Sequence, residues 1–285
     1  MSKKVTIIEC PRDAMQGMKT FIPTEKKIEY LNSLLKVGFH TLDCGSFVSP
    51  KAIPQMADTF KVIPKLDLDD TDTELSVIVA NTKGADFACE FDEISYLGYP
   101  FSVSEIFQAR NANCNMEESM ERVEKILNTC EMYGKKLVLY LSMAFGNPYG
   151  EFYDPEIVAH WVDRLSEAGV TLFSVSDTIG VANTESINQL FSILYGDFPD
   201  LSFGAHFHTT PDKWEEKIEA ASNIGCKRFD GAIKGYGGCP MAKDDLTGNM
   251  PTEKLIAYFE GKGISTGLDL DQFAESVKIS STIFG

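Results

Sequence analysis

Short runs of β-branched and other apolar residues alternate with amphipathic segments from one end of the 285-residue sequence to the other. This alternation predicts a parallel sheet whose strands are joined by helical crossovers. Strands are predicted at residues 5–10, 40–44, 75–80, 93–98, 136–143, 172–177, 201–208 and 228–234. Eight such strands predict an α/β TIM (β/α)8 barrel, with residues 1–285 as a single catalytic domain that ends in a C-terminal helical extension.

Helix start and stop signals separate the predicted strands. Asp154 and Pro155 combine a capping oxygen with a proline whose missing N–H costs nothing at the first helical position. Apolar residues follow them at helical spacing. Similar patterns begin near Thr24, Asn115, Thr184 and Pro211, and several end at a glycine, as at Gly134. We expect a solvated loop at residues 51–73, the least regular stretch.

An open doubly wound sheet is the alternative architecture for the same alternation. It ranks second because no glycine-rich dinucleotide fingerprint follows the first strand.

Composition excludes several classes of partner. A formal charge of −16 with only 26 lysines and arginines argues against a general grip on nucleic acid phosphates. No stretch approaches 18 consecutive apolar residues, so no membrane span is expected. The seven cysteines form no CxxC pair and are interpreted as reduced thiols, and we expect a cytoplasmic protein.

Two histidines stand at the end of the seventh predicted strand, where the chemistry of a parallel barrel gathers. In the segment His206-Phe207-His208, the two-residue period of a strand places both imidazoles on one face and Phe207 on the other. Two neighbouring neutral imidazoles suit a metal ion. The alternative is a pair that merely packs or forms hydrogen bonds.

Arg12 and Asp13 follow the first predicted strand and should lie at the same end of the barrel. Asp13 can complete a mixed nitrogen and oxygen shell, which favours a divalent cation such as Mg or Mn, with Zn possible. Such an ion would chelate substrate oxygens as a Lewis acid. The alternative for adjacent opposite charges is a surface ion pair.

A glycine-dense segment with one thiol, residues 235–240, follows the eighth predicted strand. Mobile glycine loops often close over a substrate in barrels. Cys239, brought near a cation, would have a lowered pKa and could exchange protons or act as a nucleophile. The alternative is a buried, inert cysteine.

Six stretches carry a resemblance that covers the chain nearly end to end. They are Pro11-Arg12-Asp13 with Gln16, residues 46–51 with Pro54-Gln55-Met56, Asp177-Thr178-Ile179-Gly180, His206-Phe207-His208, residues 237–240, and Thr247-Gly248-Asn249. In this order they resemble the 3-hydroxy-3-methylglutaryl-CoA lyases, a metal-dependent branch of the barrel enzymes.

The resemblance implies a reaction and roles for particular residues. Hydroxymethylglutaryl-CoA would be cleaved to acetoacetate and acetyl-CoA, with Arg12 stabilising the enolate and Cys239 acting as the acid or proton shuttle. The implied metal ligands are Asp13, His206, His208 and Asn249. The family also implies an acyl-CoA partner and a homodimer.

Further residues fall where the family lines its pocket or places its base. Asp43 is the implied base candidate. Substrate contacts are implied for Gln16, Ser46, Tyr140, Ser142 and Asp177, with Lys19 and Lys51 as conceivable CoA phosphate contacts and Glu253 near the site.

The sequence also departs from the family pattern. Asp43 stands where the family usually has glutamate, and Thr209 stands where it commonly has aspartate after the histidine pair. The glycines that usually flank the Pro-Arg-Asp motif are absent, and residues 239–249 form a segment one residue longer than usual. The alternatives are therefore a lyase for another hydroxyacyl-CoA, a condensing enzyme of the isopropylmalate or homocitrate synthase type, or a catalytically silent acyl-CoA-binding scaffold.

Overall fold

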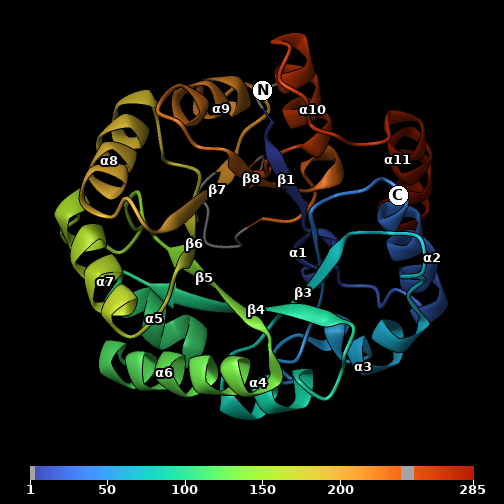
Figure 1. Cartoon of the computed structure of the whole chain (residues 1–285), viewed down its shortest axis with the longest axis horizontal. Coiled ribbons are helices and arrows are strands. Elements are labelled where there is room, and N and C mark those ends of the chain that lie inside the picture. Colours follow the sequence, from blue (N-terminus) through green and yellow to red (C-terminus); the bar gives the residue numbers. More distant parts are fainter. Residues whose placement is uncertain (1–3, 239–246) are drawn as a thin grey trace.

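Eight parallel strands close into a ring in the computed structural model, which describes residues 4–238 and 247–285. Each strand pairs with its sequence neighbours, and β8 pairs with β1 to complete the ring. Figure 1 shows the strands in the centre and the helices around them. The strands are β1 (Thr6–Glu9), β2 (Thr41–Ser46), β3 (Glu74–Ile78), β4 (Ile94–Ser102), β5 (Lys136–Ser142), β6 (Leu172–Asp177), β7 (Ser202–Thr209) and β8 (Arg228–Gly231). The predicted (β/α)8 barrel is confirmed.

Helices follow the predicted start signals closely. The Asp154 carboxylate accepts a hydrogen bond from the Glu156 backbone N–H at 2.9 Å, and the helix begins at Pro155. Gly134 adopts a left-handed φ of 65° where the preceding helix ends. The helices that match the predicted patterns are α2 (Thr24–Leu35), α6 (Met116–Tyr133), α7 (Pro155–Glu167), α8 (Thr184–Asp197) and α9 (Trp214–Asn223).

Several further elements had no individual counterpart in the predicted pattern, although a C-terminal helical extension was expected without bounds. The helices α10 and α11 end the chain, and α11 packs beside α2, where the Tyr30 and Phe284 rings meet edge to face at 5.9 Å (Figure 1). The added elements are α1 (Pro11–Gln16), α4 (Thr82–Ala88), α5 (Glu105–Ala112), α10 (Thr252–Gly261), α11 (Leu270–Phe284) and the short strand β9 (Gly248–Asn249).

Residues 51–73 are not simply the solvated loop that was expected. They contain η1 (Pro54–Met56), α3 (Thr59–Val62) and η2 (Ile63–Lys65). Asp58 is buried because Lys27 of α2 reaches it at 2.6 Å, and the Gln55 side chain is buried against the chain that follows α1. The exposed character that was predicted for the whole segment is kept at residues 51 and 52 and along the acidic stretch 67–70, where Leu68 alone is half-buried.

Strand β7 has the two-residue alternation that was predicted for its end. Phe207 points outward, where its ring meets Phe191 of α8 edge to face at 6.4 Å. The neighbouring rings of His206 and His208 lie 5.4 Å apart on the opposite face. Burial of the phenylalanine against the helix layer therefore fixes which way both imidazoles point. Among the described residues, no helix is long and apolar enough to cross a membrane.

Candidate metal centre

Asp13, His206 and His208 converge at the carboxyl end of the barrel. One ligand atom from each side chain lies within 4.8 Å of the other two. Asp13 and His208 are buried, and the His206 side chain retains only 11% of its exposure. Pro11 starts α1 directly after β1, and this turn brings Asp13 over the end of the ring. The predicted meeting of residues distant in sequence is therefore present.

Hydrogen bonds orient both imidazoles in the same way. The Nδ1 atom of His208 lies 2.7 Å from the Thr178 carbonyl, so Nδ1 must carry a proton and Nε2 keeps a lone pair. The Nδ1 atom of His206 lies 3.1 Å from Oδ2 of Asp230. Among the residues that the structure describes, none forms a hydrogen bond with the buried Nε2 atom of His208. A buried acceptor of this kind is costly unless something binds it, so the site fits a cation.

Asn249 enters the site on β9, which pairs antiparallel with β7 so that Asn249 stands opposite His208. Its Nδ2 donates to Oδ2 of Asp13 at 2.7 Å and to the Tyr236 carbonyl at 2.8 Å. These bonds leave the amide oxygen as the atom that could face an ion.

Gly237 is required by close packing around Asn249. The φ of Gly237 is 84°, and a Cβ there would lie 2.6 Å from the Asp13 carbonyl oxygen. The same Cβ would lie 2.9 Å from Nδ2 of Asn249. Packing therefore accounts for this glycine, contrary to the sequence interpretation, which invoked mobility alone.

Arg12 lies beside the three potential ligands in a buried network. Its Nε and Nη2 both donate to the Asp43 carboxylate, at distances from 2.5 to 3.2 Å. Its Nη1 donates to Asp13 and to Gln16, both at 2.9 Å. Arg12 and Asp13 are therefore part of the site and not the surface ion pair considered as an alternative. Both oxygens of Asp43 accept from the guanidinium, and its role as the base stays a prediction.

The pKa values of Asp13, His206 and His208 are shifted in different directions. Burial opposes ionisation of Asp13, but Arg12 and the two histidines hold its pKa below its ordinary value. Burial also opposes the charged form of His206, and the bond to Asp230 outweighs it, so the pKa of His206 is raised. Burial and the neighbouring His206 lower the pKa of His208. Asp13 thus favours its ionised form and His208 its neutral form, which are the states that bind a metal ion, whereas His206 must lose the proton that its raised pKa favours.

Of the remaining predicted residues, some lie near the potential metal ligands and others are exposed or bound into turns. Tyr140 lies close to the ligands, with its ring 5.5 Å from that of His206, and Ser142 is buried at the end of β5. Ser46 is buried and donates to the Ile78 carbonyl at 3.2 Å, which binds it into the β2 turn. Lys19 is exposed, as is Lys51, and Cys239 lies outside the described residues. Glu253 accepts a bond from the Lys234 backbone N–H.

Asp177 ends β6, as predicted, but its carboxylate is fully engaged by protein groups. It accepts the backbone N–H of Val181 and of Ala182, and it forms a 2.6 Å ion pair with Lys217. Both side chains of that pair are completely buried. Both oxygens of Asp177 thus accept from protein groups, and the direct substrate contact that the resemblance implied stays a prediction.

Sequence reasoning missed three charged residues that support the site. Asp230 holds His206 and also accepts a bond from Ser174 at 2.7 Å. Lys217 binds Asp177. Glu9 is buried at the end of β1, where it accepts bonds from the Ile233 backbone N–H and the Thr252 hydroxyl. Of the three, only Lys217 could have been suspected of burial from the sequence, because it lies next to apolar Ile218 in a helical pattern.

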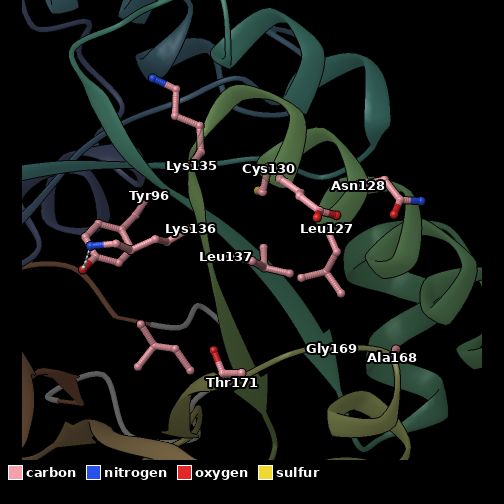
Figure 2. A pocket seen from close by; sticks show the side chains of 12 residues that line it. Tyr96, Leu127, Asn128, Cys130, Lys135, Lys136, Leu137, Ala168, Gly169 and Thr171 are labelled. Atoms are coloured by element: carbon pink, nitrogen blue, oxygen red, sulfur yellow. Dashed lines mark hydrogen bonds between the residues drawn. The ribbon is translucent and has the colours of Figure 1, made fainter.

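A separate hollow lies at the opposite end of the barrel. Figure 2 shows residues from α6 and from the starts of β5 and β6 around a space of about 440 Å³. The Lys136 ammonium there lies 3.3 Å from the Tyr96 hydroxyl. Within residues 4–238 and 247–285, the groups of three potential ligands do not include any side chain that lines this hollow, and Asp13, His206 and His208 lie at the other end.

Comparisons with known proteins agree with this geometry. Residues 4–279 match the model of the HMGL-like family. The chain is 34% identical to the 3-hydroxy-3-methylglutaryl-CoA lyase, cytoplasmic, of Danio rerio, over 95% of this chain and 81% of the relative. It is 32% identical to the mitochondrial hydroxymethylglutaryl-CoA lyase of Mus musculus, over 97% of this chain and 84% of the relative.

Solved structures give the same result. The HMG-CoA lyase of Bacillus subtilis matches with a TM-score of 0.93 at 31% identity, covering 99% of this chain and 94% of that one. An HMG-CoA lyase of Acinetobacter baumannii in complex with coenzyme A and 3-methylmalate matches with a TM-score of 0.90 at 29% identity, covering 98% and 91% of the two chains.

Proposed function

Because the chain belongs to the HMGL-like family, we propose that it is a divalent-metal-dependent lyase that cleaves 3-hydroxy-3-methylglutaryl-CoA to acetoacetate and acetyl-CoA. The observation that carries the proposal is the convergence of Asp13, His206 and His208 around the unpartnered Nε2 of His208. The named relatives match over nearly the whole chain and supply the substrate.

Asp13, His206, His208 and Asn249 would hold the ion. When bound, a divalent cation acts as a Lewis acid that polarises the oxygens of a chelating substrate. Mg or Mn suits this mixed donor set, and Zn is also compatible.

Arg12 supplies the positive charge that the products need. Cleavage leaves an acetyl-CoA enolate, and a preorganised guanidinium at a buried position stabilises such a charge far better than water does. Asp43 fixes the guanidinium plane through Nε and Nη2, and Gln16 fixes Nη1. Cys239 remains the proposed acid or proton shuttle on the strength of the resemblance alone.

The proposal also covers the setting of the reaction. An acyl-CoA thioester is the partner, in keeping with the coenzyme A bound to the Acinetobacter baumannii relative. We propose a cytoplasmic homodimer, which size-exclusion chromatography and cell fractionation would test.

A single assay tests the activity. The purified protein is incubated with hydroxymethylglutaryl-CoA in excess Mg²⁺ or Mn²⁺, with and without a chelator, and both products are quantified. We expect acetoacetate and acetyl-CoA in equal amounts, and neither after chelation. Absence of products at saturating metal would contradict the proposal. Cleavage of another hydroxyacyl-CoA, or consumption of acetyl-CoA with an oxo acid, would instead identify the alternative lyase or the condensing enzyme.

A further inference from the structure

Lys217 and Asp177 form an ion pair whose two side chains are both fully buried. The Lys217 Nζ lies 2.6 Å from Oδ2 of Asp177. Removing two charges from water is expensive, and a buried pair often stabilises a fold no more than apolar residues of the same volume. The position of this pair relative to the metal ligands is therefore informative.

Lys217 reaches the site from the outer helix layer. It lies in α9, and its Nζ also donates to the backbone carbonyl of His208 at 2.8 Å. One ammonium group thus binds the end of β6 and the end of β7 together. Since His208 is a potential ligand, its backbone position depends directly on this contact.

Asp177 controls the other contact of His208. Its oxygens accept the backbone N–H groups of Val181 and Ala182, at 2.8 and 3.0 Å, and these bonds shape the turn after β6. Thr178 lies in that turn, and its carbonyl accepts the Nδ1 proton of His208. The turn that fixes the orientation of the imidazole is therefore held by a carboxylate whose charge Lys217 balances.

We infer that Lys217 is a positioning residue for the metal centre. It sets the backbone of His208 directly and the Thr178 carbonyl through Asp177, without touching the ion. The inference rests on the proposed function, since it assumes that His208 binds a metal ion.

A second buried ion pair provides the matched control. Lys27 lies 2.6 Å from Asp58, with side-chain exposures of 3% and 8%, and its Nζ also donates to a backbone carbonyl, that of Gln55. The chemistry is the same, but Lys27 contacts neither His208 nor the turn after β6. A purely structural role for buried lysines predicts the same consequences for both pairs.

The test compares Lys217→Met with Lys27→Met in metal-free protein prepared with a chelator. Mn²⁺ affinity is measured by titration calorimetry, and thermal stability is measured without metal. We expect both variants to melt at lower temperature than the wild type. Only Lys217→Met should also lose Mn²⁺ affinity, by about 10- to 100-fold, the range found when partners of metal ligands are removed.

A double variant removes the problem of a lone buried charge. Lys217→Met leaves Asp177 unpaired, which could prevent folding, whereas Asp177→Asn combined with Lys217→Met buries no net charge. The double variant should fold and still bind Mn²⁺ more weakly than the wild type, because the contact to the His208 carbonyl is absent. Wild-type affinity in the double variant would overturn the positioning role.

The remaining outcomes separate the two proposals. Unchanged Mn²⁺ affinity in Lys217→Met, or an equal loss in Lys27→Met, would overturn the positioning role and leave the lyase proposal intact. Wild-type protein that binds Mn²⁺ but does not cleave hydroxymethylglutaryl-CoA would count against the lyase alone. Failure of the wild type to bind Mn²⁺ would overturn both.

Discussion

The two ends of the barrel treat charged side chains in opposite ways. At the carboxyl end, Arg12, Asp13 and His208 are buried, Arg12 donates to Asp13 at 2.9 Å, and Nε2 of His208 has no hydrogen-bond partner among the described residues. At the amino end, Glu74 and Lys136 pair at 3.1 Å with 32% and 59% of their side chains exposed, beside the hollow of Figure 2. A group of three potential ligand atoms within 4.8 Å of one another therefore locates chemistry better than open volume does.

The contrast extends to the response to pH. Burial raises the pKa of Glu9, at the carboxyl end of β1, to about 8. The pKa of Glu74 is lowered, because hydrogen bonds from Lys136 and Tyr96 outweigh its partial burial. The first carboxyl therefore favours its neutral form in the folded protein and the second its charged form, so these two groups should contribute to the pH dependence of stability with opposite signs.

The largest expected effect is that of Asp13→Asn. The substitution removes a charged potential ligand and a partner of Arg12, so Mn²⁺ binding should be lost and kcat/KM should fall by roughly 10³-fold or more. Calorimetry and the lyase assay measure these losses, with circular dichroism as the control for folding. Full activity in the variant would mean that the carboxyl end is not the reactive end.

Glu9→Gln should have the next largest effect, on stability. With a folded pKa of about 8 against an ordinary value of 4.5, the folded protein binds more protons than the unfolded chain between these pH values. Wild-type stability should thus fall as pH rises through that window, by up to roughly 5 kcal/mol from this group. Denaturant unfolding at pH 5 and pH 9 should show a smaller fall in the variant. Identical pH profiles would show that Glu9 does not titrate in this way.

Asp230→Asn should have an intermediate effect, confined to the metal centre. The amide keeps the shape but replaces a carboxylate that accepts from His206, so metal affinity should drop by about 10- to 100-fold. Ser174→Ala is the control, because it removes a different bond to the same carboxylate. A smaller effect of Asp230→Asn than of Ser174→Ala would contradict a direct role for Asp230.

Lys136→Met, at the amino end, should have the smallest effect. Exposed pairs contribute about 0–1 kcal/mol to stability, and lyase activity should not change. Thermal melting and the product assay measure the two quantities. A large loss of lyase activity would show that the amino end also contributes to catalysis.

The order of helices and strands was predictable because each element has its own local sequence signal. Gly134 marks the end of one helix and Asp154 the start of the next, and both are recognised without knowledge of distant contacts. The segment 51–73 was misinterpreted for the opposite reason. Gln55 and Asp58 appear to be surface residues in the sequence, and only Lys27 and the chain after α1, more than 25 residues away, bury them.

The candidate site was predictable where a local pattern or the resemblance named its residues. The period of two in β7 placed both histidines together, and the resemblance added Asn249, which no local pattern indicated. Asp230 and Lys217 were missed because their partners come from other strands and no local motif joins them. Asp177 was recognised by motif, but its role depends on that unseen lysine.

The bond between Asn249 and Asp13 joins residues 236 positions apart, across nearly the full length of the chain. On the proposed assignment, a ribosome-bound chain lacking residue 249 could present only part of the ligand set. Tight metal binding would therefore come late in biosynthesis, and an occupied metal site would indicate that the barrel had already formed.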